Sequence, residues 1–163
     1  MIYNKGFLTK LKSNKMKEET LYAKQPQDIF GRVAPESKFG FVDSNDNWII
    51  EPKFDWADDF NSYDKDSRNP LNAPVALNGK NGRIKPDGSY LIEPVFDKIW
   101  GFTEGFALVK LDGKWGYIKA DGKYLVEPKY DVAMEFSEGE AYVKIGETKG
   151  FIDTEGNWVR KTK

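Results

Sequence analysis

Apolar and polar side chains alternate along several short segments of this 163-residue chain. Residues 107–111 read ALVKL and residues 141–145 read AYVKI, so that the apolar side chains share one face of an extended segment. Alternation with β-branched residues is typical of a half-buried β-strand, whereas an amphipathic helix would need a period of about 3.6 residues. Glycine-containing DG and EG pairs between such segments indicate tight turns. The pattern therefore predicts an all-β chain.

These strand segments recur in phase around one glycine, here named the anchor glycine, in four copies of a common motif. The anchor glycines Gly40, Gly82, Gly116 and Gly150 lie in KFGFV, KNGRI, KWGYI and TKGFI. They are separated by 42, 34 and 34 residues. A fixed period of this size predicts a repeat architecture, in which each unit buries its apolar face only against its neighbours.

Other residue types repeat at fixed distances from the anchor glycine. Seven residues before it stands a valine: Val33, Val75, Val109 and Val143. Eight residues after it stands a tryptophan or tyrosine: Trp48, Tyr90, Tyr124 and Trp158. Twelve residues after it, in three copies, stands a proline: Pro52, Pro94 and Pro128. Because proline has no amide hydrogen, it ends the third strand of a unit or confines it to a sheet edge.

Each unit is expected to form a three-stranded antiparallel meander. The segments FDWADDF, FDKIWGF and YDVAMEF then add either a short fourth strand or a helical turn that returns the chain. One meander is marginal in water, so stacking four of them into a solenoid-like array would bury a continuous core. A closed, propeller-like arrangement is the alternative, because the incomplete last copy could close on the N-terminal segment.

The register divides the chain into two parts. Residues 1–30 match nothing in the repeat and are expected to be an N-terminal capping or flexible basic segment, whereas residues 31–163 form the repeat domain. The four copies cover approximately residues 31–62, 73–105, 107–139 and 141–163. An insertion at 61–71 follows the first copy.

The motif resembles the WG-repeat family, a widespread bacterial repeat often written KWG. The third copy is nearest to that pattern, since it contains KWGYI with Trp115, then DG and EPKYD. The resemblance covers about residues 31–163 and implies a β-rich repeat with a binding or structural role. The family carries no general catalytic motif to transfer. The positions that the repeat itself requires are Gly40, Gly82, Gly116, Gly150, Trp115, Pro52, Pro94 and Pro128.

Composition narrows the possible functions. The chain contains no histidine and no cysteine, which removes Ser–His and Cys–His nucleophile systems and the commonest zinc ligands. We therefore expect no enzymatic activity, no cofactor and no metal site. The net charge of −1 gives no strong nucleic-acid signal, although residues 1–24 carry a net +4 and could touch an anionic partner weakly. No apolar run is long enough for a transmembrane helix or a secretory signal, so a cytoplasmic location is the default expectation.

Residue types that repeat in every copy are ambiguous as site residues. The row of Trp48, Tyr90, Tyr124 and Trp158 could stack sugars, or it could pack between successive units. The carboxylates of the EP segments recur in pairs, which argues against a single acid–base site. We favour repeated bonds from them to backbone N–H groups or to lysines. The residues concerned are Glu51, Glu93, Glu127, Asp55, Asp97, Asp131, Lys38, Lys80 and Lys114.

The positions where the copies differ are better candidates for recognition. Asn81 and Arg83 replace expected aromatic residues in the second copy, and Trp56 and Trp100 occupy non-equivalent positions. The insertion is expected to be an exposed loop, where a rigid scaffold often carries recognition. Our hypothesis is a protein-binding surface, and the alternative is a flexible insertion beside ordinary packing residues. Its members are Trp56, Tyr63, Asp64, Asp66, Arg68, Arg83 and Trp100.

The sequence thus favours a non-enzymatic, repeat-based binding module that recognises another protein. A small inhibitor or immunity-type protein that blocks a partner enzyme is one version of this hypothesis. The alternative is a carbohydrate or cell-envelope binder that uses the repeated aromatic residues.

Overall fold

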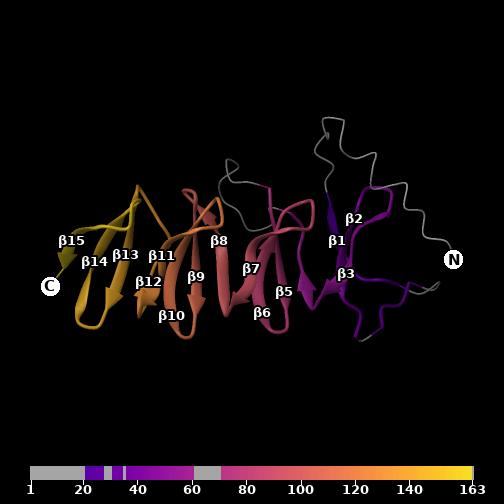
Figure 1. Ribbon diagram of the computed structural model, residues 1–163, viewed down its shortest axis with the longest axis horizontal. Helices are drawn as coiled ribbons and strands as arrows, with labels where there is room; N and C mark the ends of the chain where they lie inside the picture. The colour runs from indigo at the N-terminus through magenta and orange to yellow at the C-terminus, as the bar shows by residue number, and fades with distance from the viewer. Residues whose placement is uncertain (1–20, 28–30, 35, 61–70, 163) are drawn as a thin grey trace.

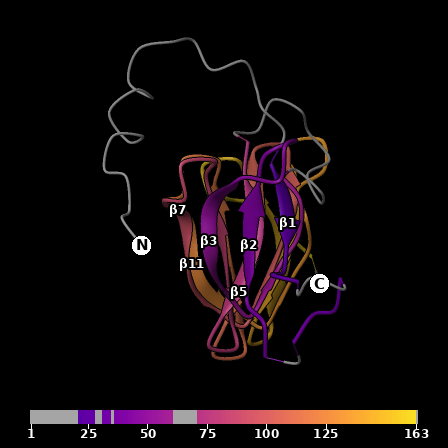
Figure 2. The ribbon, with the colours of Figure 1, turned by 90° about the vertical axis from the view of Figure 1, so that its right-hand side faces the viewer.

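The chain folds into four antiparallel β-sheets that follow one another in an open row (Figure 1). The computed structural model describes residues 21–27, 31–34, 36–60 and 71–162, and no helix occurs among them. The strands β1 and β15 lie at opposite ends of the row, and a view along the row shows the sheets one behind another (Figure 2). The predicted solenoid-like array of β-repeats is therefore confirmed, and the closed, propeller-like alternative is wrong.

The four sheets are numbered here in chain order. Sheet 1 has the order β1-β2-β3, and each later sheet has four strands in sequential order, with neighbours antiparallel. The strands are β1 Tyr22–Lys24, β2 Phe39–Val42 and β3 Trp48–Phe54 in sheet 1; β4 Trp56–Ala57, β5 Ala73–Leu77, β6 Lys80–Ile84 and β7 Tyr90–Phe96 in sheet 2; β8 Lys98–Thr103, β9 Phe106–Leu111, β10 Lys114–Lys119 and β11 Tyr124–Tyr130 in sheet 3; and β12 Val132–Ala133, β13 Glu140–Ile145, β14 Thr148–Asp153 and β15 Trp158–Thr162 in sheet 4.

The segment left open between a strand and a helical turn forms a strand, and that strand belongs to the following sheet. Asp55 lies between β3 of sheet 1 and β4 of sheet 2, and Asp97 and Asp131 occupy the same place at the next two sheet changes. Sheets 2, 3 and 4 are thus each built from two successive sequence copies. This exchange ties neighbouring copies together covalently and by strand pairing.

The first copy departs from the spacing of the others. The register predicts that Val33 pairs with the anchor-glycine strand, as Val75 does when it lies opposite Gly82. Instead, β1 provides this strand, with Lys24 opposite Gly40, and Val33 forms an isolated bridge with Gln27. Leu21, just before β1, is buried in the first core cluster, so this alternative pairing also fills the apolar face.

In the first three copies the anchor glycine lies where pairing with the third strand is irregular. Pairing between β10 and β11 shifts register around Gly116, and equivalent shifts occur around Gly40 and Gly82. In the fourth copy Gly150 pairs regularly with Lys161, and the shift follows Phe151. A Cβ on Gly116 would stand 2.6 Å from the Val126 carbonyl oxygen and 2.7 Å from the Pro128 nitrogen. The glycine therefore permits the close backbone approach that the bulge before proline requires.

The apolar core lies between successive sheets. Buried side chains of sheets 1 and 2 form one cluster, those of sheets 2 and 3 a second, and those of sheets 3 and 4 a third. Each junction between sheets thus has its own small core, as expected for a repeat array.

In the tight turn of the first copy, Asp46 replaces the glycine that the other copies have. The backbone of Asp46 adopts a φ of 64°. Aspartate tolerates this left-handed conformation better than most residues.

None of the described residues belongs to a helix that could cross a membrane.

Candidate functional site

At each of the three junctions, the residue after the anchor glycine packs on a phenylalanine of the chain segment that begins the next sheet. Phe41 meets Phe60 with ring centroids 5.2 Å apart, and Tyr117 meets Phe136 at 5.1 Å. At the junction of sheets 2 and 3 the equivalent residue is Arg83, whose guanidinium lies 5.5 Å from the ring centre of Phe102. A charged residue therefore occupies a slot that is aromatic at the two neighbouring junctions.

Arg83 is bound within this slot. Its side chain is 1% exposed, and it donates hydrogen bonds to the side-chain oxygen of buried Asn72 and, at 3.5 Å, to the carbonyl oxygen of Trp100. The second bond repeats one at the next junction, where the Tyr117 hydroxyl donates to the Met134 carbonyl at 2.7 Å. Arg83 thus replaces a tyrosine in position and in hydrogen bonding, and Asn72 accepts from its second nitrogen.

The residue before the anchor glycine also differs at this junction. Phe39 and Trp115 occupy the position in the first and third copies, and each packs against the core cluster of its junction. In the second copy the residue is Asn81. Its amide nitrogen bonds the carbonyl oxygens of Phe96, at 3.4 Å, and Asp97, at 2.9 Å. The smaller side chain is thus held against the end of β7 and does not replace the missing ring.

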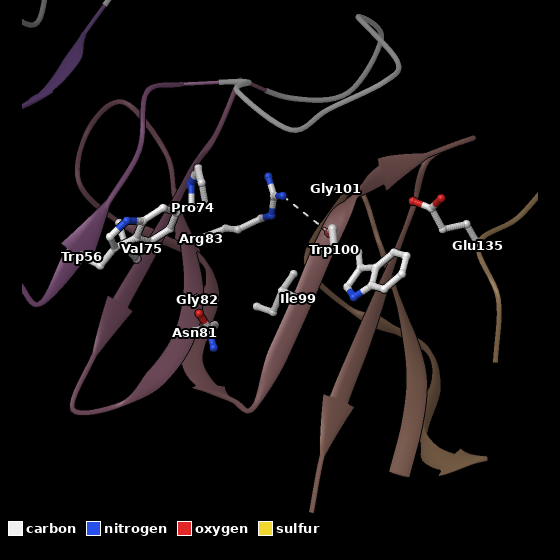
Figure 3. A pocket seen from close by; sticks show the side chains of 10 residues that line it. All are labelled: Trp56, Pro74, Val75, Asn81, Gly82, Arg83, Ile99, Trp100, Gly101 and Glu135. Atoms are coloured by element: carbon white, nitrogen blue, oxygen red, sulfur yellow. Dashed lines mark hydrogen bonds between the residues drawn. The ribbon is translucent and has the colours of Figure 1, made fainter. Parts of the chain in front are cut away.

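A cavity of about 410 Å³ lies at this junction. Figure 3 shows Ile99 pointing into the space between β6 and β8, with Asn81 and Gly82 opposite it. Trp56 and Trp100 border the cavity and are 40% and 47% exposed. The lining residues are Trp56, Pro74, Val75, Asn81, Gly82, Arg83, Ile99, Trp100, Gly101 and Glu135. The lining is mainly apolar, and its volume lies in the range of about 300–1,000 Å³ typical of ligand sites.

Trp100 is fixed by a second tryptophan. Its ring meets that of Trp115 edge to face, with centroids 6.3 Å apart and planes at 88°. Lys110 places its ammonium group 5.2 Å from the centre of the Trp115 ring. These contacts restrain an exposed side chain that would otherwise lose rotamer freedom on binding a partner.

The structure brings together three of the residues singled out in the sequence. Trp56, Arg83 and Trp100 line one cavity, although Arg83 lies in its buried wall and not on an exposed surface. Tyr63, Asp64, Asp66 and Arg68 lie outside the described residues. The sequence identified Asn81 only as a departure from the motif. Pro74 and Ile99 were missed, because nothing distinguishes them in sequence from other apolar strand residues.

The repeated aromatic row packs between successive sheets. Tyr124 of sheet 3 meets Phe96 of sheet 2 with centroids 6.2 Å apart, and Trp158 of sheet 4 meets Tyr130 of sheet 3 at 6.4 Å. Tyr90 packs against the cluster between sheets 1 and 2. These three residues therefore connect copies of the repeat, and Tyr124 combines this contact with an exposed fraction of 41%.

The repeated aspartates accept hydrogen bonds at the points where the chain passes from one sheet to the next. Asp55 accepts from Lys38, Asp97 from Lys80 and Asp131 from Lys114. The second carboxylate oxygen of Asp131 also accepts from the Gly146 amide at 2.7 Å, in the β13–β14 turn of sheet 4. The hydrogen bonds from lysine are the main reason that the pKa values of Asp55, Asp97 and Asp131 lie below their ordinary range.

The partner glutamates of the EP segments are different. Glu51, Glu93 and Glu127 are exposed. The predicted bonds to lysine and backbone are therefore made by the aspartates of each pair. Within the described ranges, no group of three or more acidic side chains is arranged to hold a metal ion.

Comparison with known proteins places residues 39–148 in one family. No curated protein and no solved structure matches the chain. The model of the WG containing repeat matches residues 39–80, 82–115 and 115–148, which include three of the four anchor glycines and span the cavity. With three consecutive repeats that cover more than half of its length, the chain belongs to the WG-repeat family.

Proposed function

We propose that this protein is a non-enzymatic binding module and that it recognises another protein at the junction of sheets 2 and 3. The observation that carries the proposal is the cavity at this junction, bordered by two exposed tryptophans that have no counterpart in the other copies. Residues required by the repeat recur in each copy, whereas Trp56 and Trp100 do not. Their place beside a cavity supports a role in recognition.

The physical chemistry of the surface suits a protein partner. Tryptophan is enriched among residues that contribute most to interface affinity, especially beside pockets that exclude water. Both tryptophans stand on strands of sheets that pack on their neighbours. Trp56 in β4 pairs with Ala76, and Trp100 lies in β8 where its pairing with β9 shifts register. A surface held in this way has little conformational entropy to lose on association.

The non-enzymatic part of the proposal rests on the chemistry of the lining. Arg83 and Glu135 are the charged residues of the cavity, and the chain has no histidine or cysteine to supply a nucleophile or a neutral-pH base. Arg83 is bound to Asn72 and to the Trp100 carbonyl. A narrower version of the proposal is a small inhibitor or immunity-type protein, which an activity assay of the captured partner, with and without the module, would test.

The test is a quantitative pull-down from a lysate of the source cell, read by mass spectrometry. The baits are the wild type, Trp56→Ala, Trp100→Ala and the control Val159→Ala, which removes an apolar side chain that is 49% exposed on sheet 4. We expect one protein to be recovered by the wild type and the control and depleted by both tryptophan variants. Melting temperatures of all four baits establish that each is folded. Equal recovery by all four would contradict the proposed surface.

A further inference from the structure

We infer that the partner inserts an aromatic side chain into the cavity between sheets 2 and 3. This inference rests on the proposed function and specifies the chemistry of the partner at that site. It follows from a comparison of the three junctions of the array, which share one plan. The second junction differs from its neighbours at three positions, where it has Asn81, Arg83 and Ile99 in place of an aromatic residue, an aromatic residue and an alanine.

The neighbouring junctions show which group the position accommodates. Phe39 at the first junction and Trp115 at the third come from the position before the anchor glycine, and both rings pack into the core clusters there. At the second junction the same position is Asn81, which lines the cavity together with the adjacent Gly82. The second junction thus lacks the ring that this repeat position supplies at its two neighbours, and the cavity lies beside it.

The lining is suited to a ring. Val75, Pro74 and Ile99 provide apolar walls, and the exposed Trp56 and Trp100 border the opening. Trp100 already makes an edge-to-face contact with Trp115, and aromatic pairs in this geometry gain stability beyond that from buried area alone. The space opens to solvent beside the two tryptophans, so a ring from a partner can enter it and pack against the apolar walls.

The charged residues of the lining limit which partner residues can flank the inserted ring. The Arg83 guanidinium is buried and donates hydrogen bonds to the Asn72 side chain and the Trp100 carbonyl. Its charge is therefore directed into the wall of the cavity. Glu135 is half-buried and lies on the far side of Trp100 from Arg83 (Figure 3). A neutral or basic segment beside the aromatic side chain therefore complements this opening better than an acidic one.

Two substitutions at Asn81 distinguish the effect of the open space from the effect of the Asn81 amide group that lines it. Asn81→Trp restores the residue found in the third copy and fills the cavity from within. Asn81→Ala removes the hydrogen bonds to Phe96 and Asp97 but leaves the space open. If an aromatic ring is the occupant, the first variant excludes it and the second does not.

The probe is N-acetyl-L-tryptophanamide, titrated into isotope-labelled protein and followed by NMR of methyl groups. We expect saturable shifts and intermolecular NOEs at the Ile99 and Val75 methyl groups in the wild type and in Asn81→Ala. In Asn81→Trp we expect affinity to fall by about tenfold or more, a difference of about 1.4 kcal/mol. N-acetyl-L-leucinamide serves as the non-aromatic control and should bind more weakly than the tryptophan derivative.

The NMR titration and the pull-down test different statements, so that each can fail without the other. Absence of saturable shifts in the wild type, NOEs confined to other surfaces, or equal binding by Asn81→Trp would overturn the inference. If Asn81→Trp does not fold, the wild-type NOEs and the comparison with Asn81→Ala still decide it. Should the captured protein depend on Trp100 while the probe fails to bind, the proposed interaction survives and only the aromatic insertion is lost.

Discussion

The Nζ atom of Lys80 lies 2.6 Å from Oδ1 of Asp97, and this ion pair marks the point where the chain leaves sheet 2 for sheet 3. The same carboxylate accepts backbone hydrogen bonds from Asp112 and Gly113, in the β9–β10 turn of sheet 3. One side chain therefore holds the end of one sheet and the turn of the next. Equivalent pairs, Lys38 with Asp55 and Lys114 with Asp131, repeat the arrangement on either side.

Asp97→Ala should destabilise the array. The substitution removes the acceptor for Lys80 and for the amides of the following turn. We expect a lower midpoint of urea unfolding and faster hydrogen exchange at the Asp112–Gly113 turn. Glu93→Ala, which truncates an exposed carboxylate on β7, is the matched control and should leave both quantities nearly unchanged. Equal effects of the two substitutions would show that Asp97 has no special role.

Stability should fall in acid for the same structural reason. The pKa values of Asp55, Asp97 and Asp131 are lowered in the folded chain, chiefly by their hydrogen bonds with lysines. A depressed folded-state pKa contributes stability that is fully present above the unfolded-state value of about 3.9 and is lost as pH falls through the folded value. Chemical unfolding from pH 6 to pH 2 should show this loss, with a shallower slope below about pH 4 in Asp97→Asn. An unchanged slope in that variant would contradict the assignment.

The repeated part of the fold could be predicted because its periodic pattern dictates strand, turn and stacking together. The first strand could not, since Lys24 lies opposite Gly40 from 16 residues away, whereas Val75 lies opposite Gly82 from seven. The alternation of side chains predicts strands, but it does not predict the length of an irregular loop between two of them. The strand exchange at Asp55, Asp97 and Asp131 was likewise left open, because a short segment after proline is compatible with a strand or a turn.

The candidate site was only partly visible in the sequence. Trp56, Arg83 and Trp100 could be selected because they break a pattern, and the structure places all three around one cavity. The cavity lies beside Asn81, where the first and third copies carry a ring, and such a space can be located only when the surrounding sheets are known. The buried position of Arg83 also depends on tertiary packing, since arginine in a strand is more often exposed.

Gly116→Ala should be strongly destabilising. The added methyl group would stand within 2.6 Å of the Val126 carbonyl oxygen, a contact that backbone cannot relieve without distorting the bulge. We expect a loss of about 3 kcal/mol in the free energy of unfolding. Gly105→Ala is the control, because nothing lies within 4 Å of its Cβ position, and its φ of +85° should cost only about 1 kcal/mol. Similar losses in both variants would refute the steric explanation.

Trp158 should matter more than its counterpart in the first copy. Its ring packs edge to face against Tyr130 of the preceding sheet, 6.4 Å between centroids. Trp48 occupies the same repeat position in sheet 1, which is the first sheet of the described row. Trp158→Ala should cost about 2 kcal/mol and speed hydrogen exchange in β14, whereas Trp48→Ala should cost about 1 kcal/mol or less. The reverse order would show that the aromatic row does not act by joining sheets.

The pair of Asn72 and Arg83 provides the sharpest test of the junction between sheets 2 and 3. Arg83→Ala removes a donor that bonds the buried Asn72 oxygen and leaves space in the slot, and it should cost about 3 kcal/mol, because the loss of a buried hydrogen bond and of packing is expensive. Asn72→Phe alone removes one acceptor of the buried Arg83 guanidinium and should cost a similar amount.

The double variant Asn72→Phe with Arg83→Tyr reproduces the third copy, where Phe106 and Tyr117 pack around Phe136 and the tyrosine hydroxyl bonds the Met134 carbonyl. A tyrosine at position 83 can pack on Phe102 and donate to the Trp100 carbonyl in the same way. We expect the double variant to regain wild-type stability within about 1 kcal/mol, or to exceed it, since an apolar replacement of a buried polar pair is often neutral or stabilising. Urea unfolding of the four proteins in this cycle measures the coupling. Additive losses would mean that the arginine slot is not equivalent to the tyrosine slot.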